Sequence, residues 1–141
     1  MSSPTSLRWS DPALADRVAS FAAQRGITIS AAIQLLTDEA LRMREHPGIV
    51  FRDGPAGRRA GLAGGPDVWE VVRSLRHATT TSGLEREELV ATNTGLTLAE
   101  VRVAIGYYTA HPADVDGQVA EAEATEEAAL QAWQRRQRLL A

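Results

Sequence analysis

The segment Thr5-Ser6-Leu7-Arg8-Trp9 constrains the fold of this chain more than any other feature. It has the alternation of a short β-strand and is closed by Ser10-Asp11-Pro12. A single strand leaves its backbone donors and acceptors unpaired, and the next β-prone residues begin only at Gly48. The economical solution is pairing with the same strand of a second copy. The sequence therefore predicts a homodimer joined by an intermolecular two-stranded antiparallel ribbon.

Two short helices are predicted after this strand. Asp11 and Pro12 suit the cap and first position of a helix, and Gly26 suits a left-handed helix end. Thr28 or Ser30 can cap the second helix, which the residue before a proline, His46, should end. Helical spacing places apolar residues on one face of each helix, Leu14, Val18, Phe21 and Ala22 on the first and Ile33, Leu36, Ala40 and Met43 on the second. Residues 1–46 are predicted to be a ribbon-helix-helix unit.

A second domain is predicted over residues 47–117. The run 48–52 and the weaker run 58–64 flank a Gly- and Pro-rich turn, which indicates a small hairpin. Three helix starts follow, each with a capping residue and a Glu three positions later, and they predict helices over 68–77, 83–92 and 98–110. The last two helices resemble a helix-turn-helix, with Leu98, Val101, Ile105 and Tyr108 as its core face. Because the outward face of helix 98–110 offers little positive charge beyond Arg102, a structural or protein-binding role is favoured there.

The remaining residues, 118–141, predict an Ala- and Glu-rich C-terminal helix. The expected fold class is therefore mainly α. It consists of an N-terminal ribbon-helix-helix, a small hairpin-and-three-helix domain and a C-terminal helix.

Composition narrows the class of protein. The chain has no cysteine, which excludes disulfides and thiolate metal sites. It has neither a signal-peptide pattern nor an apolar run of the ~20 residues that span a membrane, so a cytoplasmic protein is expected. The net charge of −3 argues against a protein coated in nucleic acid. Residues 1–46 contain five Arg and five acidic residues, a balance that still allows a small basic surface to contact DNA.

The predicted ribbon has the polar residues that a DNA reader needs. Alternation sends Thr5, Leu7 and Trp9 to one face of the strand and Ser6 and Arg8 to the other. Arg can donate two hydrogen bonds to guanine, and Ser can bond several bases. The start of the second helix, near Thr28 and Ser30, would offer backbone N–H groups to a DNA phosphate.

Ser6-Leu7-Arg8-Trp9, the helix ending at Gly26 and the polar turn into a second helix resemble the Arc/MetJ/CopG ribbon-helix-helix family over about residues 4–46. The resemblance implies that Ser6 and Arg8 contact operator bases and that Pro4 takes a third such position, where the family usually has a polar residue. The stretch from His46-Pro47-Gly48 through Gly64-Gly65-Pro66-Asp67 to His111-Pro112 is similar to a small helical domain of unknown function, family 433. Such domains occur in antitoxins encoded beside PIN-like ribonuclease toxins. The resemblance therefore implies an autoregulatory antitoxin with two partners, operator DNA and a cognate PIN-like toxin.

The C-terminal helix is the second expected interaction surface. Its apolar stripe is narrow, so a groove on a partner could complete it, with Leu130 and Trp133 as anchors. Arg135, Arg136 and Arg138 could then occupy the acidic metal site of the toxin. The alternative is a solvated helix that folds back on the second domain.

No catalytic, cofactor or metal site is expected. The three histidines, His46, His77 and His111, are widely spaced, and two of them precede a proline, which is typical of helix termination. No nucleophile elbow and no phosphate-binding loop is present. Two alternatives to the antitoxin remain, a stand-alone repressor or copy-control protein and an inhibitor that binds protein but not DNA. An enzyme is a third alternative, less favoured than these two.

Overall fold

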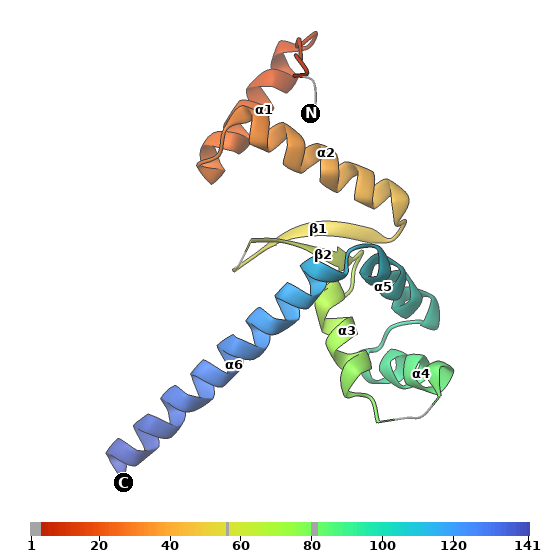
Figure 1. Ribbon diagram of the computed structural model, residues 1–141, viewed down its shortest axis with the longest axis vertical. Coiled ribbons are helices and arrows are strands. Elements are labelled where there is room, and N and C mark those ends of the chain that lie inside the picture. Colours follow the sequence, from red (N-terminus) through yellow and green to blue (C-terminus); the bar gives the residue numbers. More distant parts are fainter. Residues whose placement is uncertain (1–3, 56, 80–81) are drawn as a thin grey trace. The chain divides into compact units, whose positions relative to one another are not determined.

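The computed structural model describes residues 4–55, 57–79 and 82–141 and is mainly α-helical (Figure 1). It has six helices and one two-stranded antiparallel hairpin in the middle of the described chain. The elements are α1 Pro12–Arg25, α2 Ile29–Glu45, β1 Ile49–Gly54, β2 Gly57–Leu62, α3 Val68–His77, α4 Gly83–Thr94, α5 Leu98–Ala110 and α6 Pro112–Leu140. The chain divides into two compact units, Met1–Arg44 and Glu45–Ala141.

In the first unit, α1 and α2 begin and end at the predicted signals. The Asp11 carboxylate accepts a hydrogen bond from the Ala13 N–H at 2.9 Å, and Gly26 ends α1 with φ 63°. The Thr28 hydroxyl accepts from the Ala31 N–H at 3.1 Å and so caps α2. Among the described residues, the buried apolar cluster of this unit consists only of Val18, Ala22 and Ala32.

The N-terminal segment differs from the prediction. Residues 4–9 are not a strand in the single chain, and the hairpin of this molecule is formed by β1 and β2 instead. The physical reason is that a strand needs a hydrogen-bonding neighbour, and the described residues of the first unit include no other strand. The apolar faces predicted for α1 and α2 are also only partly covered, since Leu14 is 42 % and Met43 38 % exposed.

The second unit is built on the hairpin. Ile49 pairs with Leu62 and Gly54 with Gly57 at the two ends of an antiparallel register. Arg52 on β1 connects the hairpin to the turn that follows it. Its guanidinium donates hydrogen bonds to the carbonyl oxygens of Leu62 at 3.1 Å and Gly65 at 2.9 Å, and to the Asp67 carboxylate at 3.0 Å. One apolar cluster joins β1, β2 and the four helices, and it includes Ile49, Leu62, Val68, Trp69, Val71, Val90, Val101, Tyr107, Val115 and Val119.

Capping residues set the starts of α3, α4 and α5. The Glu70 carboxylate accepts from the Asp67 N–H at 2.8 Å, and the Ser82 hydroxyl accepts from the Glu85 N–H at 3.3 Å. Thr97 and Glu100 form a reciprocal capping box, with bonds of 2.7 and 3.1 Å. The predicted bounds of α3 and α5 are confirmed, and α4 extends to Thr94.

The C-terminal helix is longer than predicted. Instead of starting at residue 118, α6 starts at Pro112, where proline at the first helical position lacks only an N–H that would have no acceptor within the helix. The boundary that the sequence placed between residues 117 and 118 therefore lies inside one helix. Val115 and Val119 are buried in the second unit, whereas residues 123–141 are all exposed. In Figure 1 this part of α6 runs beyond the other elements of its unit. In the part of the chain that the structure describes, no helix combines the length and apolarity needed to cross a membrane.

Candidate interaction surfaces

The N-terminal segment keeps the predicted alternation although it is not a strand. Thr5, Leu7 and Trp9 line one side of an open groove of about 970 Å³, whose other side is α2. Pro4, Ser6 and Arg8 are exposed and do not line this groove. Thr5, Leu7 and Trp9 therefore lie on the groove side of the segment, and Pro4, Ser6 and Arg8 do not.

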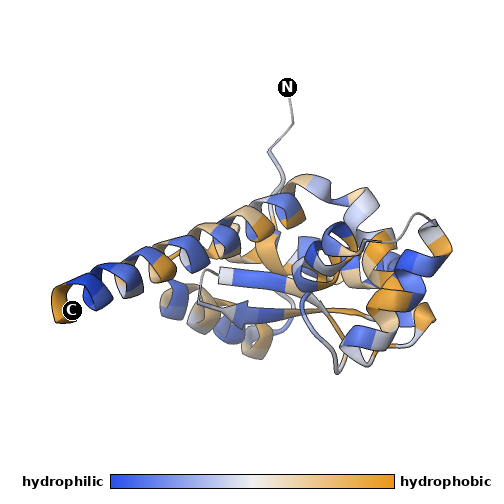
Figure 2. Ribbon diagram, turned by 90° about the horizontal axis from the view of Figure 1, so that it is seen from below, coloured by the Kyte–Doolittle hydropathy of each residue, from blue (hydrophilic) through white to orange (hydrophobic). Residues whose placement is uncertain are grey.

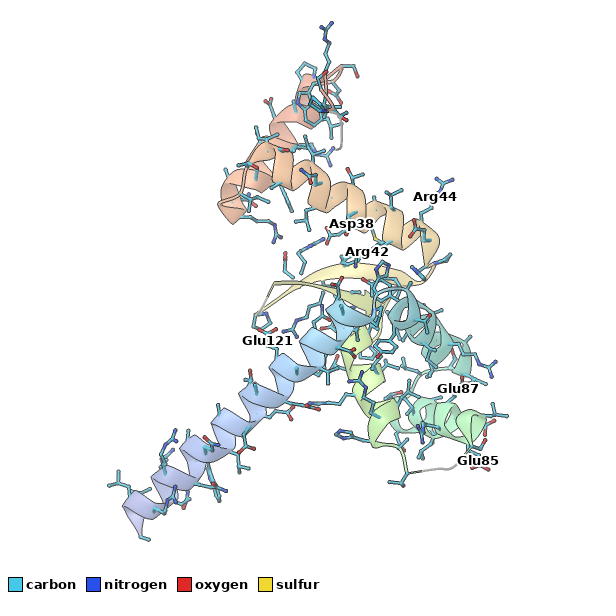
Figure 3. The ribbon with its side chains drawn as sticks, viewed as in Figure 1. Asp38, Arg42, Arg44, Glu85, Glu87 and Glu121 are labelled. Atoms are coloured by element: carbon cyan, nitrogen blue, oxygen red, sulfur yellow. The ribbon has the colours of Figure 1, made fainter. Side chains whose placement is uncertain are left out.

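We name this groove the N-terminal groove; it is lined by Thr5, Leu7, Trp9, Ile29, Ser30, Ile33, Gln34, Thr37, Asp38 and Leu41. Its large apolar side chains are open to solvent, with Leu7 59 %, Ile29 48 % and Leu41 51 % exposed. Polar side chains stand beside this apolar floor, and one of them, Asp38, makes an ion pair of 2.9 Å with Arg42 on the same helix (Figure 3). An apolar centre with polar surroundings is typical of a protein interface.

The start of α2 presents the two predicted phosphate-binding residues, Thr28 and Ser30, and both are exposed. The Thr28 hydroxyl is engaged as the cap, and the Ser30 hydroxyl accepts from the Gln34 side-chain amide at 3.3 Å. The N–H groups of Ile29 and Ser30 lie in the first turn, where a helix provides no acceptor of its own. An anion near this turn would be bound by backbone N–H groups instead of by the hydroxyls.

The α4–α5 pair has little capacity to read DNA. The Arg102 guanidinium donates to the Glu87 carboxylate at 2.9 Å, so its charge is neutralised by α4. Figure 3 shows Glu85 and Glu87 on α4, and these acidic side chains would repel phosphates. The buried face of α5 is centred on Val101, Ala104 and Tyr107, which confirms Val101 as a core residue and adds two that were not predicted. Ile105 and Tyr108 pack against this core from its edge. Leu98, Ile105 and Tyr108 are only half-buried.

The exposed part of α6, residues 123–140, is named the α6 tail. It presents every residue predicted to bind a partner, with Leu130 48 % and Trp133 59 % exposed and Arg135, Arg136 and Arg138 also exposed. Hydrophobic residues are spaced along a mostly hydrophilic helix (Figure 2). Near its start, Arg73 of α3 donates to the Glu126 carboxylate at 2.6 Å. The folded-back arrangement considered from the sequence therefore applies to the first half of α6, and the tail is solvated.

An aromatic and acidic cluster in the second unit was missed from the sequence. The rings of His46 and His111 lie 5.7 Å apart, and Tyr107 lies 5.4 Å from His46 and 4.8 Å from His111 between ring centroids. Glu45 adds a carboxylate to this group. The sequence signal was the repeated His-Pro dipeptide, which had been interpreted as helix termination alone.

A polar network joins α3, α5 and α6 on the surface of the second unit. The Arg76 guanidinium bonds to the Asp116 carboxylate and, at 3.1 Å, to the Tyr108 hydroxyl. The hydrogen bond from Arg76, and to a smaller extent the 3.1 Å bond from the Tyr108 hydroxyl, lowers the pKa of Asp116. The bonds that Arg76 makes to Asp116 and to Tyr108 raise the pKa of Arg76. This network fixes the start of α6 and is structural.

None of the protein-family models, curated proteins or solved structures compared with the chain matches it. Arguments about function therefore depend on the surfaces described above.

Proposed function

We propose that the chain is the antitoxin of a toxin–antitoxin pair, a cytoplasmic homodimeric ribbon-helix-helix regulator that binds its own operator and neutralises a PIN-like ribonuclease. The observation that carries this proposal is the N-terminal groove. Exposed Leu7, Ile29 and Leu41 line it, and the unit to which they belong buries only a small apolar cluster. A unit of this size rarely folds alone without a further source of stability, and a second copy would supply it.

A two-fold ribbon would complete this unit in two ways. Pairing residues 5–9 with the same residues of a second copy would give their backbone N–H and C=O groups the partners that a strand needs. It would also bring Leu7 and Trp9 of each copy over both pairs of helices. The open groove and the non-strand conformation of residues 4–9 in one copy would thus have one common explanation.

The ribbon would contact DNA bases with the side chains that do not line the N-terminal groove. Ser6 and Arg8 would project toward the bases of the major groove, with Pro4 beside them, and each bidentate Arg–guanine pair is worth roughly 1–3 kcal/mol of discrimination. The first turn of α2, at Thr28 and Ser30, would bind a phosphate on each side of the ribbon. No catalytic role is assigned to any residue.

The α6 tail would bind the toxin. Trp133 and Leu130 are large, exposed apolar side chains on an otherwise polar helix, as expected of a segment that docks into a groove on another protein. Arg135, Arg136 and Arg138 would pair with the carboxylates that hold magnesium in a PIN-like nuclease. Toxin binding would also bridge dimers on the operator and increase avidity.

Operator binding can be tested by fluorescence anisotropy with the DNA upstream of the gene and a scrambled duplex. Wild type should prefer the upstream DNA, Arg8→Ala should lose this preference, and Arg17→Ala should keep it. Arg17 is the matched control because it is an exposed arginine of the same unit, on α1. Equal affinity of wild type and Arg8→Ala would contradict ribbon reading.

The near-neutral charge of residues 1–46 favours a second candidate, an inhibitor that binds protein but not DNA. The two functions differ in their response to salt, because phosphate contacts release counterions and make DNA affinity fall steeply as salt rises. Absence of DNA binding at low salt, with and without the product of the neighbouring gene, would favour the inhibitor. Operator binding without any nuclease encoded nearby would favour a stand-alone repressor.

A further inference from the structure

Three potential metal ligands meet in the second unit although they come from distant parts of the sequence. Glu45 and His46 lie where α2 ends, and His111 lies between α5 and α6. One ligand atom from each residue, a carboxylate oxygen or an imidazole nitrogen, lies within 4.8 Å of the other two. Glu45 is exposed and the two histidines are half-buried, so the carboxylate lies on the solvent side of the group.

The backbone and the core hold the two histidines in place. The His46 carbonyl accepts a hydrogen bond from the Ile49 N–H at 3.0 Å, and the His111 N–H donates to the Tyr107 carbonyl at 3.0 Å. Tyr107, which is only 2 % exposed, contacts both imidazole rings. The hydrogen bonds fix the backbone of each histidine, and the buried Tyr107 ring packs beside both imidazoles.

We propose that Glu45, His46 and His111 bind a divalent transition-metal ion of the Zn²⁺ class. Two imidazoles and one carboxylate form a donor set that zinc and its neighbours in the first transition row accept, and one that magnesium and calcium do not prefer. Zinc bonds of about 2.0–2.1 Å to nitrogen and oxygen put tetrahedral ligand atoms roughly 3.3 Å apart. Side-chain rotation has to contract the present 4.8 Å spread by about 1.5 Å. Water would complete the coordination.

The charge of the cluster favours a cation. His111 follows the last turn of α5, where the carbonyl ends of the helix carry partial negative charge, and it also precedes the first turn of α6, where the N–H groups carry partial positive charge. The Glu45 carboxylate therefore supplies the net negative charge of the cluster. A bound ion would connect the residues that precede β1 to the α5–α6 junction. It would therefore stabilise the second unit, because binding to the folded state alone raises the free energy of unfolding.

The test uses the full-length chain without an affinity tag, titrated with Zn²⁺ in a calorimeter and with Co²⁺ in an absorption experiment. One equivalent of each ion should bind, and Co²⁺ should give visible bands of a low-coordinate site. His46→Gln, His111→Gln and Glu45→Gln should each weaken binding roughly tenfold or more, in the range seen even for supporting residues of metal sites. His77→Gln is the matched control, since His77 ends α3 and lies outside the cluster; it should bind as wild type does.

Thermal unfolding gives a second measurement, in which each protein is compared with and without Zn²⁺. A variant with a lower starting Tm can therefore still be tested. Zn²⁺ should raise the Tm of the wild type and of His77→Gln, and at the same concentration it should raise the Tm of His46→Gln by clearly less. Mg²⁺ should have no effect on any of them. No zinc binding by the wild type, or equal binding by wild type and His46→Gln, would overturn the proposal.

Discussion

At the scale of single residues, Gly61 is the glycine at which an added Cβ atom would come closest to another group, the guanidinium of Arg52. A Cβ atom at Gly61 would lie 2.0 Å from the Arg52 Nη2 atom and 2.6 Å from Cζ. The guanidinium group would have to move and would lose its bonds to Leu62, Gly65 and Asp67. We expect Gly61→Ala to lower the free energy of unfolding by about 1–2 kcal/mol, because hydrogen bonds to a charged group are lost from a partly solvated site. Urea denaturation followed by circular dichroism measures this difference.

Gly106→Ala is the control for this experiment. A Cβ atom at Gly106 has no neighbour within 4 Å, and the residue lies inside α5. Alanine should therefore be neutral or stabilise the protein by up to about 1 kcal/mol. A Gly61→Ala protein as stable as Gly106→Ala would mean that the Arg52 bonds contribute nothing measurable.

The Asp116 carboxylate gives a prediction about pH. The hydrogen bond from Arg76 lowers its pKa in the folded state, so the charged form stabilises the fold above the unfolded pKa, and this stability is lost as the pH falls through the folded value. Asp116→Asn should therefore be less stable than wild type at pH 7, and the difference should shrink below the usual aspartate pKa of about 3.9. Asp114→Asn is the comparison variant, on the same turn of α6. Thermal unfolding of both variants from pH 7 to pH 3 measures the effect, and a difference for Asp116→Asn that is constant over this range would contradict it.

At the scale of elements, α6 should behave as two segments with different roles. Val119 is 3 % exposed and belongs to the core, so deletion of residues 118–141 should destabilise the second unit by at least the roughly 1.5–3 kcal/mol of one buried Val. Deletion of residues 129–141 removes only exposed side chains and should change the stability by less than about 0.5 kcal/mol. Denaturant midpoints of the two truncated proteins test this difference. Similar midpoints would mean that residues 118–128 of α6 do not contribute to the stability of the core.

The shorter truncation also tests the proposed function without unfolding the protein. It removes Leu130, Trp133 and the three arginines of the α6 tail and keeps the bond between Arg73 and Glu126. We expect loss of inhibition of the neighbouring ribonuclease and no loss of operator binding. Inhibition that survives this truncation would place the toxin-binding surface elsewhere.

Elements with local signals could be predicted from the sequence, and elements without them could not. The caps at Asp67, Thr97 and Gly26 depend on neighbouring residues, and they gave the correct bounds for α3 and α5 and the correct end of α1. The start of α6 was wrong because His111-Pro112 ends one helix and also begins the next, and only the first of these roles was considered. Residues 5–9 are predicted as a strand that pairs with a second copy, so one copy alone cannot supply its hydrogen bonds.

At the scale of the whole molecule, the candidate sites also divide into those with a local sequence signal and those without one. The exposed positions of Ser6, Arg8 and the α6 tail follow from alternation and from sparse apolar spacing, both of which can be read along one segment. The meeting of Glu45, His46 and His111 depends on how α2 ends relative to α5 within the second unit. Tertiary packing decides that arrangement, and no local pattern in the sequence encodes it.

The two units should also differ in how their stability depends on protein concentration. If a second copy covers the N-terminal groove, then the folding of the first unit is linked to association, and its Tm should rise with protein concentration. The second unit has its own core and should unfold at a Tm that is independent of concentration. Leu41→Asp places a charge on an exposed side chain of the N-terminal groove and should make the chain monomeric by sedimentation, whereas Gln24→Asp, on an exposed site of α1 outside the groove, should stay dimeric. A monomeric wild type at micromolar concentration, with a first unit that unfolds at a constant Tm, would remove the ribbon as the means of dimerisation and as the means of DNA reading.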